Sequence, residues 1–513
     1  MSGEGPSRRA LLTGGAALSL AGPALAQTAP ASRPNLILFF PDEMRADALG
    51  CYGNAVCKTP NLDRLAREGA RFENCHVQYP VCGASRCSLL TGWPTSVRGH
   101  RSLYYFLRPD EPNLFRYLRR AGYDVFWYGK NDALAQASFA DSVTDWKDGG
   151  APFGPATSRA LAGPGLTPGQ VSMLYPGLSD RREGSDYANL QSAVRILERK
   201  EAERPFCIFL PLFNPHPPYA APKDFQEMYR PGDLPPLTPP GLPKHPPFHA
   251  DMRATYPLAG LSDAQLRKVR AVYYGQVSYA DWILGELMEA LERTGRAKDT
   301  ALVVGSDHGD YAGDYGLTEK WPSGLEDCLT HVPLIARIPG GQSGVVASDM
   351  TELFDIMPTF LDLAGTRATH THFARSLIPQ LRGGPGDPSR AAFTEGGYNL
   401  SEPQAFEPIL PGLYEPKTRL QHTHPTDVAR CAAIRTRTHK LIERPGGQSE
   451  LYDCAKDPAN AHNLIDAPSL AGVRTALRTR LADWYIATSG VPPTDKDPRG
   501  LPPAPPMTAK TGA

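Results

Sequence analysis

The stretch NLILFFPDE, residues 35–43, is an apolar run that ends in a proline and two carboxylates, Asp42 and Glu43. A run of this length, rich in branched and aromatic residues, is typical of a strand buried on both faces of a parallel sheet. The same design, an apolar run followed by polar residues, recurs three times: YDVFWYG (123–129) before Lys130 and Asp132, FCIFLPLF (206–213) before His216, and ALVVG (301–305) before Asp307 and His308.

Helical patterns separate these runs. Residues 59–69 begin with a threonine N-cap and a proline and end at a glycine. Residues 262–295 carry one apolar stripe with steps of four and three, between a Ser262–Gln265 capping box and a final glycine. Strands that alternate with helices predict an α/β domain.

The polar residues that follow the four runs are expected to meet, because ligands in open α/β sheets bind beyond the carboxyl ends of the strands. A single acidic residue after a strand is more simply a loop former or a helix cap. Four strand ends that carry polar residues of complementary chemistry favour one shared site over four unrelated structural roles. Carboxylates from Asp42, Glu43 and Asp307 suit Ca²⁺ or Mg²⁺ better than zinc. Lysines and a histidine beside a dication suit an anionic substrate.

Residues 1–26 are predicted to be an export signal rather than part of the fold. They have a charged start, a short apolar stretch and an A-x-A cleavage site before Gln27. Ser7-Arg8-Arg9 indicates a twin-arginine signal, for which the alternative is an ordinary secretory signal with two chance arginines. We therefore expect a periplasmic or secreted protein that uses the twin-arginine export machinery.

Charge and hydropathy narrow the choice of partners. The 513 residues include 54 lysines and arginines and 54 aspartates and glutamates, a balance that argues against nucleic acid or an anionic membrane as partner. No other stretch is long and apolar enough to span a bilayer. Export permits disulfides, and the nine cysteines show no CxxC pair.

The stretch PVCGASRCSLLTG, residues 80–92, places Cys82 and Cys87 around a Ser-Arg pair. The two cysteines are candidates for a disulfide, for a metal pair, or for one reactive group with a bystander.

This stretch resembles the signature of the type I sulfatase family, in which Cys-x-Pro/Ala-Ser-Arg precedes Leu-Thr-Gly. The resemblance covers residues 34–464 in the family's order. It implies an alkaline-phosphatase-like fold, with a large, mostly parallel sheet flanked by helices and a smaller C-terminal antiparallel sheet with one helix. Five further segments carry it: PNLILFFPDEMRADALGCYGN, GYDVFWYGK, PHPPY, VVGSDHGDYAGDYGLTEKW and ELYDCAKDPANAHNL.

The expected division of the chain follows from the same resemblance. A sulfatase catalytic domain covers residues 33–385, a C-terminal α+β subdomain covers 389–490, and a flexible proline-rich tail covers 491–513. Within the subdomain, residues 430–444 and 449–458 are predicted to be strands joined by a glycine-containing turn, followed by a helix to about residue 487.

The resemblance also implies that a maturase oxidises Cys82 to Cα-formylglycine, whose hydrated aldehyde attacks sulfur. A gem-diol supplies an oxygen nucleophile and later expels sulfate by restoring the aldehyde, which splits one hard step into two. Cys87 is then a bystander that faces the core from a helix beginning near Ser85. Helix geometry makes a Cys82–Cys87 disulfide unfavourable.

Roles for the other residues are implied position by position. Glu43 stands where the family usually has Asp or Gln, and its side chain is one methylene longer than that of Asp. The implied roles are metal ligation of Ca²⁺ or Mg²⁺ by Asp42, Glu43, the formylglycine at 82, Asp307 and His308, orientation of the formylglycine by Arg86, sulfate binding by Lys130 and Lys320, and general acid catalysis by His216.

Two features depart from this pattern or lie beside it. Asp132 stands where many family members have histidine, and either contacts the substrate or caps a helix. Residues 96–105 place Arg98 and His100 soon after the motif, where they line the pocket of an anionic substrate or form a solvated basic loop.

Three functions are therefore open. The first is a sulfuric ester hydrolase that releases inorganic sulfate from a sulfated carbohydrate or another small molecule. The second keeps the fold but hydrolyses phosphate or phosphonate esters. The third is a non-catalytic glycan-binding relative, against which the intact cysteine, arginine and lysine set argues.

Overall fold

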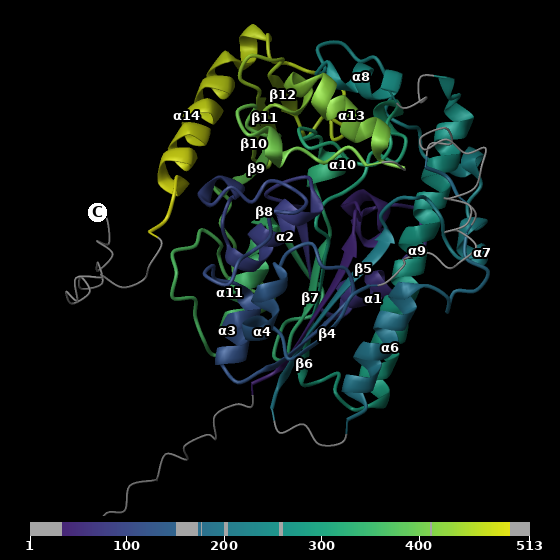
Figure 1. Cartoon of the computed structure of the whole chain (residues 1–513), viewed down its shortest axis with the longest axis vertical. Helices are drawn as coiled ribbons and strands as arrows, with labels where there is room; N and C mark the ends of the chain where they lie inside the picture. Colours follow the sequence, from purple (N-terminus) through teal and green to yellow (C-terminus); the bar gives the residue numbers. More distant parts are fainter. Residues whose placement is uncertain are drawn as a thin grey trace, which may run out of the picture. The chain divides into compact units, whose positions relative to one another are not determined.

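An eight-stranded sheet forms the centre of the fold (Figure 1). The computed structural model describes residues 33–149, 173–175, 177–199, 204–255, 260–410 and 413–492. The expected export signal and the tail beyond Pro492 lie outside these residues. The strand order is β4-β3-β5-β1-β6-β7-β2-β8, and only β7 runs against its neighbours. The strands are β1 (Asn35–Asp42), β2 (Ala70–His76), β3 (Asp124–Tyr128), β4 (Asp145–Lys147), β5 (Phe206–Pro215), β6 (Thr300–Gly305), β7 (Leu334–Arg337) and β8 (Val345–Glu352).

The four apolar runs of the sequence are the adjacent strands β3, β5, β1 and β6. β1 pairs in parallel with β5 and β6, so that Phe39 lies opposite Leu210 on one side and Val304 on the other. Its side chains alternate between two cores, with Phe39 in one and Phe40 in the other. The prediction of parallel strands buried on both faces is confirmed.

Helices cover both faces of this sheet (Figure 1). The predicted helices are confirmed, including the reciprocal Ser262–Gln265 capping box at the start of α9. No helix among the described residues combines the length and apolar character that a bilayer crossing requires. One core contains residues of α1 (Pro60–Glu68), α6 (Ser185–Leu197) and α9 (Asp263–Arg293), and the other contains residues of α2 (Cys82–Thr91), α3 (Leu114–Arg120) and α11 (Ile356–Leu363).

A second, four-stranded sheet follows the large one in the chain, with the order β12-β11-β10-β9 and antiparallel pairing throughout. Residues 430–444 hold two strands rather than the one predicted, because the chain turns back between Arg435 and His439. Side chains of α14 pack against this sheet in a small core of their own. The elements are β9 (Ala392–Gly396), β10 (Cys431–Arg435), β11 (His439–Glu443), β12 (Glu450–Asp453) and α14 (Ala471–Thr488).

Gly275 in α9 supports a test of this packing. A Cβ at this position would lie 2.3 Å from the carbonyl oxygen of Phe225 in α7 (Lys223–Gln226), and a backbone atom cannot easily move aside. We expect Gly275→Ala to lower the free energy of unfolding by about 1–3 kcal/mol, as overpacking does, measured by urea denaturation.

Gly472 in α14 is the matched control. A Cβ there meets no heavy atom within 4 Å, so Gly472→Ala should be neutral or stabilise the fold by up to about 1 kcal/mol. Equal effects of the two substitutions would contradict the close approach of α9 and α7.

Candidate active site

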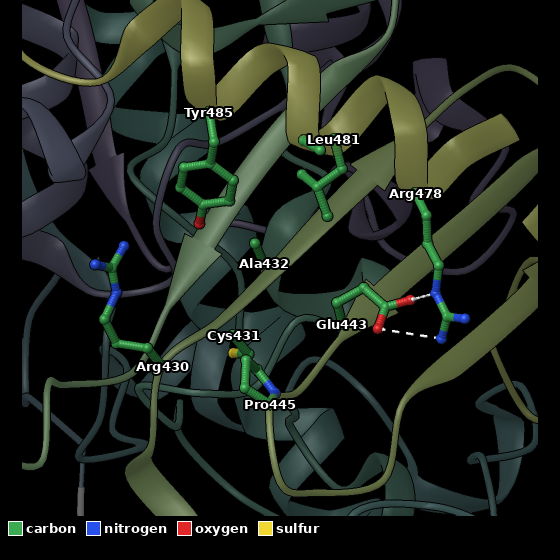
Figure 2. Close-up of a pocket in the computed structure, with 9 residues that line it drawn as sticks. Arg430, Cys431, Ala432, Glu443, Pro445, Arg478, Leu481 and Tyr485 are labelled. Atoms are coloured by element: carbon green, nitrogen blue, oxygen red, sulfur yellow. Dashed lines mark hydrogen bonds and ion pairs between the residues drawn. The ribbon is translucent and has the colours of Figure 1, made fainter. Parts of the chain in front are cut away.

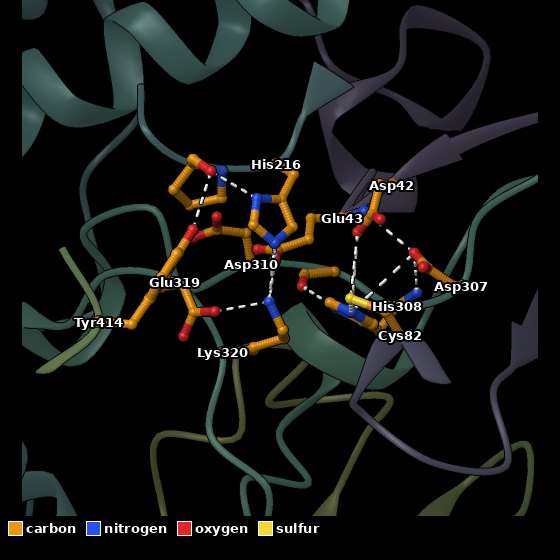
Figure 3. Close-up of polar contacts among 12 residues, drawn as sticks. Asp42, Glu43, Cys82, His216, Asp307, His308, Asp310, Glu319, Lys320 and Tyr414 are labelled. Atoms are coloured by element: carbon orange, nitrogen blue, oxygen red, sulfur yellow. Dashed lines mark hydrogen bonds and ion pairs between the residues drawn. The ribbon is translucent and has the colours of Figure 1, made fainter. Parts of the chain in front are cut away.

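The carboxyl ends of the central strands meet in one buried cluster (Figure 3). One ligand atom each from Asp42, Cys82, Asp307 and His308 lies within 4.8 Å of the others. A second such group contains His216, Glu43, Asp42 and Cys82. The structure therefore brings together polar residues that lie more than two hundred positions apart in the sequence.

Cys82 is the first residue of α2, three positions before the expected start near Ser85. Its Sγ lies 3.1 Å from Nε2 of His308, 3.5 Å from Oδ1 of Asp42 and 3.7 Å from Nζ of Lys130. Burial raises the pKa of the thiol well above its usual range. The position combines a helix N-terminus, whose free N–H groups favour negative charge, with carboxylate, imidazole and ammonium groups.

Arg86 follows one helical turn after Cys82 and is completely buried. Its Nε donates to Oδ2 of Asp307 at 2.8 Å, and a terminal nitrogen donates to Oδ2 of Asp42 at 2.8 Å. Burial alone would lower the pKa of the guanidinium, but the two aspartates outweigh it and raise that pKa. Arg86 thus ties the start of α2 to the ends of β1 and β6.

Lys130 links Asp42 and Asp132. Its Nζ lies 2.7 Å from Oδ2 of Asp42 and 2.9 Å from Oδ2 of Asp132. Burial raises the pKa of Asp42, but Lys130 and then Arg86 outweigh it and hold that pKa well below its usual range. Asp132 therefore lies at the site, and 18% of its side chain stays exposed.

Lys320 contacts the cluster through Glu43 and His216. Its Nζ donates to Glu43, to Oε1 of Glu319 at 2.5 Å and to Nε2 of His216 at 3.2 Å. These three bonds use all three protons of the ammonium group. The orientation of His216 is therefore linked to the position of Lys320.

Both site histidines have their ring orientation set by the backbone. Nδ1 of His308 donates to the carbonyl of Gly309 at 2.8 Å, and Nδ1 of His216 donates to the carbonyl of Pro217. Each Nε2 is thereby left facing the cluster, an arrangement common for metal-binding imidazoles. Burial lowers the pKa of both rings, and for His216 the charges of Lys320 and Lys130 lower it further.

Glu43 supports the binding of a cation. Its backbone lies in the left-handed region, with φ at 65°, and its N–H donates to Oδ1 of Asp307 at 3.1 Å. Burial raises the pKa of its carboxyl well above the usual range. Oε2 is buried and meets no hydrogen-bond partner among the described residues. A buried carboxyl oxygen in a group with Asp42, Cys82 and His216 fits a hard cation that prefers oxygen ligands.

The loop that carries His216 is held by residues that the sequence analysis did not identify. Asp186 accepts hydrogen bonds from the backbone of Phe213 and Asn214 at 2.8 and 2.9 Å. Nε2 of Gln276, from α9, donates to Oδ1 of Asn214 at 3.1 Å and to the carbonyl of His216 at 3.2 Å. No local pattern in the sequence connects these positions.

Lys417 and Tyr414 were also missed. Nζ of Lys417, from α13 (Glu415–Thr423), lies 2.9 Å from Oε2 of Glu319. The hydroxyl of Tyr414 donates to the carbonyl of Pro217 at 3.0 Å, beside His216 (Figure 3). The adjacency of Glu319 to Lys320 was the only sequence signal for this network. No pattern in the sequence identified Lys417, about a hundred residues away, as the partner of Glu319.

Arg98 and His100 do not join the cluster. Arg98 lies over the ring of Trp93 and lines a separate pocket with Asp110 and Arg116. His100 is buried, with Nε2 3.0 Å from Oε1 of Glu111 and Nδ1 2.7 Å from the carbonyl of Tyr105. Its partners hold it in a structural ion pair rather than in an anion-binding pocket.

The cysteines form no disulfides, since all nine are free thiols. Cys87 lies in the core between the sheet and α2, and its Sγ lies 3.6 Å from the carbonyl of Ala133. Cys82 points into the polar cluster instead. The separation of the two by the helix, which opposes a disulfide, is confirmed.

A pocket of about 430 Å³ lies away from this cluster, between the small sheet and α14 (Figure 2). Its walls are mainly apolar, with Leu481 and Tyr485 on one side and Ala432 on the other. A Glu443–Arg478 ion pair of 2.6 Å closes one end. It lacks the convergent polar groups of the strand-end cluster, which is the stronger candidate for an active site.

Comparison with known proteins agrees with this geometry. A model of the sulfatase family matches residues 34–366. The chain belongs to the sulfatase family. The sulfatase is 28% identical to iduronate 2-sulfatase of Homo sapiens over 386 residues, 64% of this chain and 69% of the relative. It is 27% identical over 517 residues to the multifunctional alkaline phosphatase superfamily protein PehA of Trinickia caryophylli, covering 89% and 96% of the two chains.

The fold is shared with enzymes of more than one specificity. The structure superposes on the phosphonate monoester hydrolase of Agrobacterium radiobacter with a TM-score of 0.71, at 24% identity and with 89% and 96% of the chains covered. The predicted alkaline-phosphatase-like fold is confirmed, and the chain is a sulfatase enzyme rather than a non-catalytic relative.

The His100–Glu111 pair makes stability depend on pH. Burial alone would lower the pKa of His100, but hydrogen bonds with Cys87 and Glu111 raise it to about 10. Because the folded pKa exceeds the unfolded value of about 6.5, the stabilisation is complete below that pH and is lost as the pH rises toward about 10.

We therefore expect His100→Gln to destabilise the protein more at pH about 6 than at pH about 10, measured by urea denaturation at both values. His462→Gln is the control, because the side chain is 79% exposed and lies 3.6 Å from Asp457, so that water screens the pair and the difference should be much smaller. A His100→Gln effect that does not shrink with rising pH would contradict a charged His100.

Proposed function

We propose that this sulfatase hydrolyses sulfate esters with the residue at position 82 as nucleophile, after conversion of Cys82 to Cα-formylglycine. The observation that carries the proposal is the position of Cys82 at the first residue of α2, within 3.7 Å of His308, Asp42 and Lys130. When formed, the hydrated aldehyde supplies an attacking oxygen that a thiol lacks. A formylglycine-generating maturase is the implied partner.

A divalent cation completes the proposed site. Asp42, Glu43, Asp307 and His308, with residue 82, would hold it, and their carboxylate majority favours Ca²⁺, with Mg²⁺ as the alternative. The ion would polarise a sulfate oxygen and lower the pKa of a hydroxyl bound to it. Arg86 would orient residue 82 and keep both aspartates in place, as its two 2.8 Å hydrogen bonds indicate.

Lys130, Lys320 and His216 are assigned to direct contacts with the sulfate ester. The charges of Lys130 and Lys320 both act on Cys82 and would hold the sulfate oxygens of an ester bound there. A bound anion would offset these charges, which now lower the pKa of His216. Nε2 of His216 would then carry a proton to donate to the leaving oxygen.

A sulfated carbohydrate is the proposed substrate class. Iduronate 2-sulfatase, whose name specifies a sugar acid, is among the relatives. The partly exposed carboxylate of Asp132, beside Lys130, is suited to accept a hydrogen bond from a sugar hydroxyl. The twin-arginine motif supports export to the periplasm or the medium as part of the same proposal.

Phosphate or phosphonate ester hydrolysis is the second candidate, favoured by the long match to the multifunctional alkaline phosphatase superfamily protein. The ratio of kcat/KM for nitrophenyl sulfate to kcat/KM for a nitrophenyl phosphonate ester separates the two. A ratio above one supports the sulfatase assignment, and a ratio below one supports the alternative.

The nucleophile assignment predicts different results for the two cysteines of the motif. Cys82→Ala removes the attacking group and should lower kcat for nitrophenyl sulfate by on the order of 10⁴-fold or more. Cys87→Ala should leave most of the turnover, since Cys87 faces the core. The tryptic peptide containing residue 82 should have the mass of formylglycine rather than cysteine when a maturase is present. Equal loss in both variants, with the fold intact by circular dichroism, would refute the assignment.

The acid assignment predicts a dependence on the leaving group. His216→Ala should slow hydrolysis of a sugar sulfate by about 10²–10⁴-fold and of nitrophenyl sulfate much less, because only the sugar alkoxide needs a proton. Asp132→Asn should mainly raise KM, as expected for a contact made before the transition state. If Asp132→Asn shows the leaving-group pattern instead, then Asp132 is the acid.

A further inference from the structure

A second cluster of metal-binding side chains lies outside the active site. It contains His245, at the end of the proline-rich segment 230–248, His249 of α8 (Phe248–Thr255), and Glu326, which precedes α10 (Asp327–Thr330). One ligand atom from each residue lies within 4.8 Å of the others. The proposed reaction uses none of the three.

His245 has an unsatisfied nitrogen. Its Nδ1 is buried and has no hydrogen-bond partner among the residues described. Its Nε2 lies 3.4 Å from the carbonyl oxygen of Ala461, which is a weak contact. Leaving a buried polar atom unpaired costs about 1–3 kcal/mol. A metal ion bound at Nδ1 would remove this cost.

The other two residues contact each other directly. Nε2 of His249 lies 2.7 Å from Oε1 of Glu326, while Oε2 of Glu326 accepts a hydrogen bond from the hydroxyl of Tyr311 at 2.9 Å. Tyr311 thereby fixes the carboxylate and leaves Oε1 facing the imidazole. Support of a ligating carboxylate by an outer hydrogen bond is common at metal sites.

Aromatic rings enclose the cluster. The ring of His249 lies 4.7 Å from Phe248 and 5.0 Å from Tyr315, and the ring of His245 lies 5.5 Å from Tyr315, all between centroids. Such walls limit access of water and strengthen a metal–ligand interaction.

We propose that His245, His249 and Glu326 bind a transition metal ion such as Zn²⁺, at a site separate from the catalytic cation. Two imidazoles and one carboxylate are a zinc ligand set, whereas Ca²⁺ and Mg²⁺ prefer oxygen ligands. The ion would replace the proton in the His249–Glu326 hydrogen bond, and water would fill the remaining coordination position.

The proposed metal site would support the loop at residues 306–310, which carries Asp307 and His308 of the active site. The chain just after Glu326 accepts hydrogen bonds from the backbone of that loop, with Gly309 donating to Leu329 at 2.8 Å and Asp310 donating to Cys328 at 3.1 Å. A metal at Glu326 would therefore join α8 and the proline-rich segment to the turn that buttresses Asp307 and His308. The role is structural and does not depend on the identity of the substrate.

Cobalt titration tests the site directly. With the full-length protein and saturating Ca²⁺ present, added Co²⁺ should bind saturably and give the intense visible absorption of a tetrahedral nitrogen-containing site, which added Zn²⁺ then abolishes. His245→Ala and His249→Ala should lose this signal. His462→Ala, at an exposed position, should keep it. Zn²⁺ should raise the melting temperature of the wild type but of neither cluster variant.

Two outcomes would overturn the proposal. Absence of saturable Co²⁺ binding in the Ca²⁺-loaded wild type, which requires no variant to fold, would make His249–Glu326 an ordinary ion pair. Loss of the signal in Asp307→Asn with retention in His245→Ala would assign the cobalt to the active site. Because absorption and melting temperature are measured without substrate, failure here would leave the proposed sulfatase function untouched.

Discussion

The active site depends on one buried guanidinium. Arg86 is fully buried and pairs with both Asp42, the last residue of β1, and Asp307, two residues after β6. Removing one partner of a buried charge pair typically costs about 3–5 kcal/mol, because the other charge is left uncompensated. Since Arg86 lies one turn after Cys82 on α2, this pairing also fixes the helix N-terminus against the carboxyl edge of the sheet. The position of Cys82 therefore depends on the order of the strands.

A second chain of buried groups lies beside the first, in which Lys320, Glu319 and Lys417 alternate in sign and the carboxyl of Glu43 adjoins Lys320. Lys417 comes from α13, beyond the parallel sheet, so the strand ends alone do not build the site. Such alternation lets many ionised groups share one dehydrated site without a large uncompensated charge.

The fold does not decide which ester is cleaved. Both sulfatases and phosphonate monoester hydrolases have this architecture, as the structural match shows. Specificity for one kind of ester must come from the side chains that the shared sheet carries. Asp132, the partly exposed carboxylate next to Lys130, is the clearest difference from the pattern that the sequence resembles, and it lies 2.9 Å from that lysine.

The sequence alone determined the parallel sheet, both predicted helices and the meeting of Asp42, Lys130, His216 and Asp307. These depend on local information, because apolar runs specify buried strands and the carboxyl ends of parallel strands share one edge. Only the tertiary structure decided that α2 begins at Cys82, that His100 pairs with Glu111, and that Lys417 reaches Glu319. A long chain offers each charged residue many residues of opposite charge as potential partners, and no periodic pattern in the sequence selects among them. The selection is made by burial, which penalises every charge whose partner the fold does not bring within reach.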